Sequence, residues 1–290
     1  MQLSPSELIL NSDNSIYHLN LVPEDIAETI ITVGDPDRVG DVSKYFDVIE
    51  LKKGKREFIT HTGVLNGKRI TVISTGIGTD NIDIVINELD ALANVDFKSR
   101  TLTSNLTKLN IIRIGTSGAI QPFIPVDSFL MSEYAIGFDN LLHFYDASHV
   151  LHPDIQKAFV NHTDWYTEKS TPYVVRYSEI LGKKLISNRI RLGFTATNTG
   201  FYGPQGRKLR VTTQDPDLNS KIGSFTYKNL QITNLEMETS GIYGLSTLLG
   251  HQAVSLNCIL ANRSTGEFSK QPAKAVDELI QYTLDKITSL

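Results

Sequence analysis

Short runs of β-branched and aliphatic residues that lead straight into a glycine-rich turn recur along the first part of the chain. Residues 29–33 run into Gly34, residues 69–73 into the turn 74–78, and residues 109–114 into the turn 115–119. These runs predict buried strands, and apolar residues at helical spacing follow the first two turns. Strands that alternate with helices are typical of an α/β fold.

A hairpin interrupts this alternation. Asn66 and Gly67 separate two strand-like runs, which is a strong signal for an antiparallel β-hairpin. We therefore predict an α/β fold, a single domain over residues 1–290 with a mixed central β-sheet flanked by helices. Within it we expect residues 1–16 to be flexible, residues 94–108 to form an inserted surface loop, and residues 138–178 to be irregular.

Composition and charge exclude several classes of protein. The chain of 290 residues has a net charge of −4, with 40% hydrophobic and 21% charged residues, as in an ordinary globular protein. The acidic balance argues against a nucleic-acid partner. No apolar run reaches membrane-spanning length, and the N-terminus lacks the pattern of a secretory signal. The single cysteine, Cys258, excludes an internal disulfide framework, so we expect a cytoplasmic protein.

Two arginines near predicted strand ends suggest an anion site. Arg38 follows Gly34, Asp35 and Pro36, which suit a turn, a helix N-cap and a first helical position, and a helix N-terminus presents backbone N–H groups to anions. Arg113 lies in a strand expected to be buried, where a charge is costly unless it is paired. Its partner is either an internal carboxylate or an anionic ligand at the end of the strand, where open α/β sheets bind ligands.

The segment 201–207 combines aromatic and planar polar side chains. Gln205 can both donate and accept hydrogen bonds, and Arg207 only donates. Together they could recognise the edge of a flat heterocycle, with Phe201 or Tyr202 against its face. The alternative is an ordinary surface turn.

The order of these motifs carries more information than any one of them. They are Gly34-Asp35-Pro36-Asp37-Arg38, Arg56-Glu57-Phe58, the turn 74–78, the segment 113–122, Gln205-x-Arg207 and Glu236-Met237-Glu238. In this order, from about residue 17 to residue 263, the chain resembles the uridine phosphorylases of the nucleoside phosphorylase superfamily. Purine enzymes of that superfamily usually have a Ser-Asp motif where this chain has Ala261-Asn262-Arg263, so the resemblance is to the pyrimidine branch.

The resemblance implies reversible phosphorolysis of uridine to uracil and ribose 1-phosphate, and it leaves open deoxyuridine and thymidine as further substrates. It implies phosphate-binding by Gly34, Arg38, Arg56, Arg113 and Thr116. It implies ribose-binding by His18, Glu236, Met237 and Glu238, and base-binding by Phe201, Gln205 and Arg207, supported by Arg263. His18 and Arg56 would come from a neighbouring subunit, so a homo-oligomer with shared sites is implied, either a dimer or a trimer of dimers.

The resemblance implies no cofactor, since phosphate is a co-substrate. A potassium site with Glu57 and Ile77 is an open question, because Asn81 stands where bacterial relatives carry serine. Two alternatives remain. A nucleosidase would use water in place of phosphate, which the three arginines argue against. A non-catalytic nucleoside-binding protein would need no paired phosphate and ribose motifs.

Overall fold

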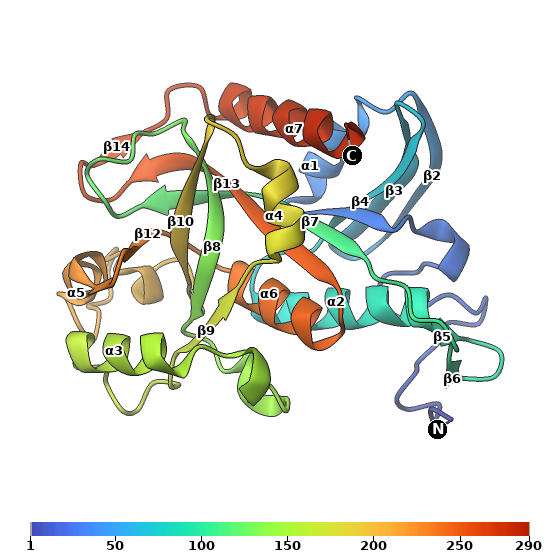
Figure 1. Cartoon of the computed structure of the whole chain (residues 1–290), viewed down its shortest axis with the longest axis horizontal. Helices are drawn as coiled ribbons and strands as arrows, with labels where there is room; N and C mark the ends of the chain where they lie inside the picture. Colours follow the sequence, from blue (N-terminus) through green and yellow to red (C-terminus); the bar gives the residue numbers. More distant parts are fainter. Residues whose placement is uncertain (1, 290) are drawn as a thin grey trace.

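The computed structural model describes residues 2–289, and its centre is a large mixed β-sheet (Figure 1). The strands follow the order β11-β12-β10-β8-β13-β7-β1-β4-β3-β2, with β9 beside β8 and β14 beside β13. Their bounds are β1 (Thr29–Val33), β2 (Val48–Lys55), β3 (Phe58–Leu65), β4 (Lys68–Ser74), β7 (Asn110–Ala119), β8 (Phe129–Gly137), β9 (Tyr173–Arg176), β10 (Ile190–Thr197), β11 (Thr226–Tyr227), β12 (Leu230–Glu236), β13 (Gln252–Asn262) and β14 (Glu267–Phe268).

The sheet combines parallel and antiparallel pairs. The strands β4, β1, β7 and β13 are parallel neighbours, as are β8, β10 and β12, whereas β2, β3 and β4 form an antiparallel meander. The carboxyl end of β7 also pairs with β12, so β7, β13, β8, β10 and β12 close into a ring of strands. This closure brings the ends of β7 and β12 together.

Helices cover both faces of the sheet. They are α1 (Pro36–Ser43), α2 (Thr79–Asn94), α3 (Pro153–Thr163), α4 (Glu179–Leu185), α5 (Leu218–Ser224), α6 (Thr239–Leu248) and α7 (Pro272–Thr288), with 3-10 turns η1 (Pro23–Asp25), η2 (Leu141–Phe144), η3 (Ser148–Val150) and η4 (Gly203–Gln205). One core cluster contains the buried faces of α2 and α6, and another those of α1, α4 and α7. The predicted α/β fold with a mixed sheet between helices is confirmed.

Three predictions about irregular regions differ from the structure. The predicted turn 115–119 is part of β7, because β13 pairs with it along its whole length. Residues 138–178 contain α3 and β9, and β9 is held by pairing with β8. Residues 94–108 contain a small hairpin of β5 (Val95–Asp96) and β6 (Thr101–Leu102), which is more structure than an inserted loop requires.

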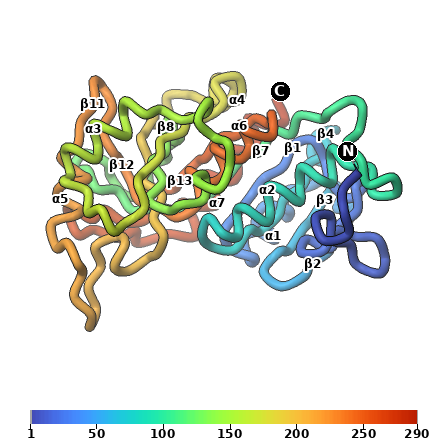
Figure 2. Tube along the Cα trace, turned by 90° about the horizontal axis from the view of Figure 1, so that it is seen from below, coloured from blue at the N-terminus to red at the C-terminus, as the bar shows by residue number. Residues whose placement is uncertain are grey.

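The N-terminal segment also differs from the flexible segment that we expected for residues 1–16. Leu8 and Ile16 are buried in the core, and the backbone N–H of Leu3 donates to the carbonyl of Arg100 near the β5–β6 hairpin. Met1 lies outside the described residues. Figure 2 shows this segment against the β2–β3 side of the molecule, far from α5.

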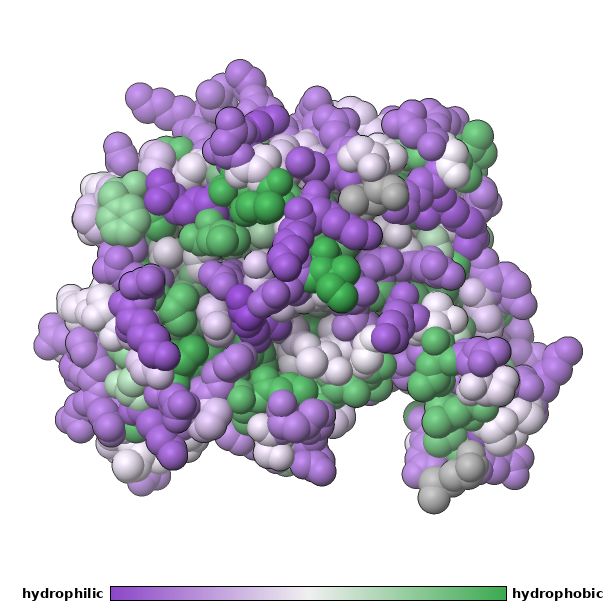
Figure 3. Space-filling model, viewed as in Figure 1, coloured by the Kyte–Doolittle hydropathy of each residue, from purple (hydrophilic) through white to green (hydrophobic). Residues whose placement is uncertain are grey.

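The surface in Figure 3 is mostly hydrophilic, with hydrophobic residues scattered between the charged ones. Within residues 2–289, every helix is too short or too polar to cross a membrane.

Candidate active site

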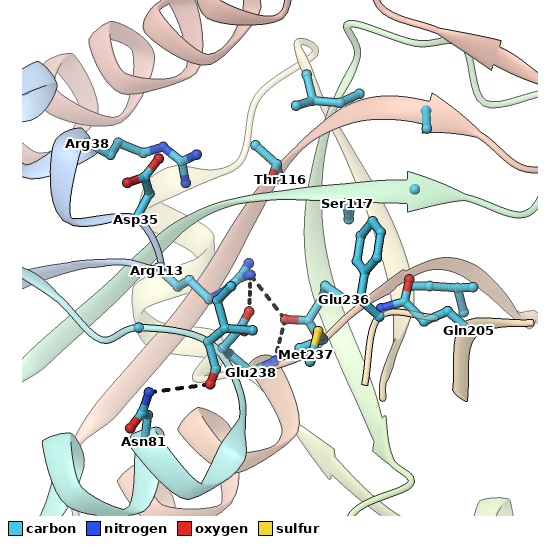
Figure 4. Close-up of a pocket in the computed structure, with 18 of the residues that line it drawn as sticks. Asp35, Arg38, Asn81, Arg113, Thr116, Ser117, Gln205, Glu236, Met237 and Glu238 are labelled. Atoms are coloured by element: carbon cyan, nitrogen blue, oxygen red, sulfur yellow. Dashed lines mark hydrogen bonds and ion pairs between the residues drawn. The ribbon is translucent and has the colours of Figure 1, made fainter. Parts of the chain in front are cut away.

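A cavity of about 790 Å³ lies where the ends of β7 and β12 meet the N-terminus of α1 and the η4 turn. It brings together most of the residues that the sequence predicts for the site, and Figure 4 shows several of them pointing into one space. They are Gly34, Arg38, Arg113, Thr116, Glu236, Met237, Glu238, Phe201, Gln205 and Arg207, together with Glu57, Ile77 and Asn81.

One end of the cavity is built to attract an anion. Asp35 caps α1 by accepting a hydrogen bond from the backbone N–H of Asp37 (3.0 Å), and Pro36 begins the helix as the sequence predicts. Arg38 lies on the first turn, half-buried, and its guanidinium forms no hydrogen bond or ion pair with residues 2–289. Burial lowers the pKa of Arg38, the nearby Asp35 carboxylate opposes this shift, and the nearby Arg113 adds to it. An anion placed here could accept charge-assisted hydrogen bonds from the Arg38 guanidinium.

Arg113 is held by carboxylates, as the first of the two alternatives from the sequence requires. Its Nη2 lies 2.6 Å from Glu238 Oε2 and 3.3 Å from Glu236 Oε2, and its Nη1 donates to Asn257 Oδ1 at 3.0 Å. A Cβ at Gly115 would collide with the guanidinium, so glycine makes room for it. Two carboxylates share one guanidinium here, and burial raises the pKa of Glu238.

The two glutamates form the middle of the cavity. Glu236 Oε2 accepts from the backbone N–H groups of Glu238 and Thr239, both at 2.9 Å, and Glu236 Oε1 accepts from Thr197 Oγ1 at 2.6 Å. Glu238 Oε1 accepts from the backbone N–H of Gly78 at 3.0 Å. Gly78 has a φ of 98°, a conformation that suits glycine. Fixed carboxylate oxygens of this kind suit a ligand that donates several hydroxyl hydrogen bonds.

The η4 turn forms the other end, and it is not a simple surface turn. Gln205 is buried, and its Oε1 accepts from Arg207 Nη1 at 2.6 Å. The Arg207 guanidinium also lies over the ring of Phe201, 3.7 Å from its centroid, and Arg263 Nη1 donates to the Gln205 carbonyl at 3.4 Å. Burial and the charge of Arg263 lower the pKa of Arg207 to about 10. The ring of Phe201 and the guanidinium of Arg207 therefore line the cavity together, and Arg263 adds a second cation close to Arg207.

Three predicted residues do not line this cavity. Arg263 supports η4 from behind, while His18 and Arg56 lie apart from the lining residues. Lys55, the residue before Arg56, donates to the carbonyl of Tyr17 at 2.5 Å and lies over the Tyr17 ring. The segments that carry His18 and Arg56 are thus in contact with each other, and neither residue lines the chain's own cavity.

Ser117 and Phe268 are among the lining residues that the sequence did not assign to the site. Ser117 lines the cavity from β7, where Asn234 Nδ2 donates to its hydroxyl at 2.9 Å, and Phe268 lines it from β14. Ser117 lies inside a motif that the sequence singled out, next to Thr116. Phe268 lies 63% exposed in a short strand that no local pattern predicts.

The described residues contain no group of three or more His, Cys, Asp or Glu side chains that could hold a metal ion. Glu57, Ile77 and Asn81 all line the cavity, and the Asn81 amide donates to the Ile77 carbonyl at 3.4 Å. The potassium site with Glu57, Ile77 and Asn81 stays a prediction.

Comparison with known proteins shows the family to which the chain belongs. A family model of the phosphorylase superfamily matches residues 28–287. The uridine phosphorylase of Thermococcus kodakarensis is 31% identical over 264 residues, which cover 89% of this chain and 81% of that protein. The uridine phosphorylase of Haemophilus influenzae is 28% identical over 264 residues, which cover 89% of this chain and 90% of that protein.

A solved structure gives the same answer for the fold. The structure of a Trypanosoma brucei nucleoside phosphorylase that shows uridine phosphorylase activity superposes with a TM-score of 0.88 at 29% sequence identity. It covers 98% of this chain and 100% of that chain. These matches confirm the resemblance that the ordered motifs indicate, and this chain belongs to the phosphorylase superfamily.

Proposed function

We propose that this protein is a uridine phosphorylase, a pentosyltransferase that converts uridine and phosphate into uracil and ribose 1-phosphate. The proposal rests on the order in which cationic, carboxylate and planar polar side chains follow one another along one cavity. Arg38, without a partner among residues 2–289, lies at one end, the carboxylates of Glu236 and Glu238 in the middle, and the Gln205–Arg207 pair at the other end. That order matches a phosphate, a sugar and a base.

The proposed reaction breaks the C1′–N1 bond of the nucleoside. A phosphate oxygen attacks C1′, and the electron pair of the broken bond leaves with N1 of uracil, which is protonated afterwards. Arg38, Arg113 and the N–H groups at the start of α1 would hold the phosphate beneath C1′, so that attack becomes effectively intramolecular. The Glu238 carboxylate would favour the electron-poor sugar ring of the transition state.

The base end would stabilise the leaving group. Negative charge develops on the uracil carbonyls as the bond breaks, and preorganised donors act most strongly where charge develops. Arg207 and Gln205 are already fixed against each other, and Phe201 lies beside them. No general acid is required, because an anionic uracil can leave when its charge is matched.

The same proposal includes a shared site. His18 and Arg56 would complete the cavity of a neighbouring subunit, with His18 at the 5′-hydroxyl of the ribose and Arg56 at the phosphate. Supporting this, both lie outside the lining of their own cavity and are linked through Lys55 and Tyr17. A dimer is the smallest assembly that supplies these residues to every site.

Release of uracil, measured with and without phosphate, tests the proposal. Uridine should be cleaved in phosphate buffer and not in sulfate-free, phosphate-free buffer of equal ionic strength. Inosine serves as the purine control, and thymidine and deoxyuridine report the breadth of the pyrimidine site. Equal rates in both buffers would instead indicate a nucleosidase, and binding without any turnover would indicate a nucleoside-binding protein.

A further inference from the structure

A single carboxylate on α2 fixes His18. Glu88 accepts hydrogen bonds from the backbone N–H groups of His18 (3.1 Å) and Leu19 (2.9 Å), and its Oε1 lies 2.6 Å from His18 Nδ1. The His18 side chain is 26% exposed and that of Glu88 is 14% exposed. The ring of Tyr17 meets the imidazole edge-on, at 4.8 Å between centroids. Glu88 and Tyr17 therefore hold the imidazole, and the rest of the ring is partly exposed to solvent.

The contact with Glu88 also decides which nitrogen of His18 carries the proton. A carboxylate only accepts hydrogen bonds, so the Nδ1 that faces it must be the donor. In the neutral imidazole, Nε2 is then left with its lone pair free. In this neutral tautomer the nitrogen that remains available to a ligand is an acceptor, which suits a hydroxyl group.

The position of His18 indicates that it does not serve the cavity of its own chain. Neither His18 nor Glu88 lines the chain's own cavity. Tyr17 is bound through its carbonyl by Lys55, which precedes Arg56, so the segment around His18 and the β2–β3 turn form one unit. Asn11 Oδ1 accepts from the same Lys55 ammonium at 3.0 Å and ties the N-terminal segment to this unit.

We propose that Glu88 is a positioning residue for catalysis in the neighbouring subunit. It orients His18 so that Nε2 accepts a hydrogen bond from the 5′-hydroxyl of the nucleoside bound there. This inference rests on the proposed function and on the shared site, and it adds a residue that touches no substrate. Glu88 acts on the 5′-hydroxyl only, through one imidazole.

The test compares two substrates that differ in this hydroxyl alone. The values of kcat/KM for uridine and 5′-deoxyuridine are measured at saturating phosphate for the parent, Glu88→Ala, Glu88→Gln, His18→Ala and the His18→Ala/Glu88→Ala double variant. Asp83→Asn is the matched control, since Asp83 lies on the same helix and contacts Tyr145 and not His18. Thermal unfolding of each variant shows whether it is folded.

Glu88→Ala should lower kcat/KM for uridine about tenfold, as expected for a misplaced hydrogen bond to a hydroxyl, and leave 5′-deoxyuridine within about twofold of the parent. The double variant should lose no more than His18→Ala alone, because both changes remove one interaction. Glu88→Gln keeps the shape and one acceptor oxygen, so the same preferential loss should be present and smaller. Asp83→Asn should change neither value.

Equal losses on both substrates for Glu88→Ala and Glu88→Gln would overturn the inference, because they would show a structural role only. Additive losses in the double variant would overturn it as well. If His18→Ala lowered kcat/KM equally for uridine and 5′-deoxyuridine, the inference and the role given to His18 would both be wrong. Phosphate-dependent cleavage of uridine would survive each of these results, so failure here is distinct from failure of the proposed function.

Discussion

In the proposed function, recognition of the base depends most on Arg207. It bonds to Gln205, covers Phe201, and lies close to a second cation, Arg263. Because burial and Arg263 lower the pKa of Arg207 to about 10, the unliganded site holds positive charge at a cost that a bound anion would offset. A leaving uracil anion is such a partner.

Replacement of Arg207 by alanine should therefore reduce kcat/KM for uridine by about ten- to a hundredfold, which corresponds to about 1.5–3 kcal/mol for a lost charge-assisted hydrogen bond. Steady-state kinetics at saturating phosphate measure this. Lys208→Ala is the matched control, since it removes an exposed cation at the next position. If the Arg207→Ala variant kept the parent's kcat/KM, η4 would not be part of the base site.

At the scale of single residues, the sequence predicted which side chains line the cavity better than it predicted their partners. Arg38 and Arg113 stand out in the sequence because a charge in or beside a buried strand is costly unless it has a partner. The two carboxylates that bind Arg113 come from the last residue of β12 and from the residue before α6, far along the chain, and no local pattern connects them to Arg113. His18 and Glu88 are also far apart in sequence, so their contact is visible only in the folded structure.

Three elements meet at one buried acid, Asp139. Its Oδ1 accepts from the hydroxyl of Tyr173 on β9 (2.6 Å) and from the backbone N–H of Leu141, and its Oδ2 accepts from Ser240 on α6 (3.1 Å). Burial raises the pKa of Asp139, although these hydrogen bonds oppose the shift. The folded protein therefore holds this proton to a higher pH than the unfolded chain does.

This raised pKa has a consequence for stability. The contribution of Asp139 is full below the pKa of the unfolded chain, at about pH 4, and is lost as pH rises through the higher pKa of the folded state. An amide at this position does not titrate and could keep the same partners. As pH rises from 4 to neutral, we expect the difference in melting temperature to shift in favour of the Asp139→Asn variant, as shown by unfolding in a pH series.

A constant difference in melting temperature across that pH series would contradict the raised pKa. Asp154→Asn, on α3, is the control, since its side chain is exposed and no contact of this kind holds it within residues 2–289.

Elements with a strong local signal were predicted well, and elements held by pairing were not. The hairpin at Asn66-Gly67, the capped helix α1 and the apolar face of α7 match the sequence prediction. The glycines of 115–119 predict a turn, yet this stretch continues β7, since β13 lies beside it. The helix α3 was missed although Pro153, Ile155 and Phe159 have the spacing of a helix with a buried face.

At the scale of the whole molecule, the central expectation is a site made by two chains. Each site would combine Arg113 of one subunit with Arg56 of its neighbour. Arg56→Ala and Arg113→Ala should then each be nearly inactive, because phosphate is left under-neutralised and misplaced. A mixed dimer of the two variants should contain one doubly damaged site and one intact site, since a two-fold interface is reciprocal.

Unfolding and refolding the two inactive variants together should therefore restore activity. At random mixing, recovery should approach about a quarter of the parent's sites, by the same symmetry. Each variant refolded alone is the control. Mass spectrometry shows whether hybrid dimers have formed. If they have formed and the mixture regains no activity, Arg56 does not serve the neighbouring site.

The identity of the sugar product distinguishes phosphorolysis from hydrolysis of uridine. Uridine and inorganic phosphate are incubated with the protein, and the reaction is followed by phosphorus NMR while uracil is measured in the same sample. We predict that a ribose 1-phosphate resonance grows in equal amount to the uracil released, at the expense of inorganic phosphate. Release of uracil with free ribose and an unchanged phosphate signal would contradict phosphorolysis and the role given to Arg38 and Arg113.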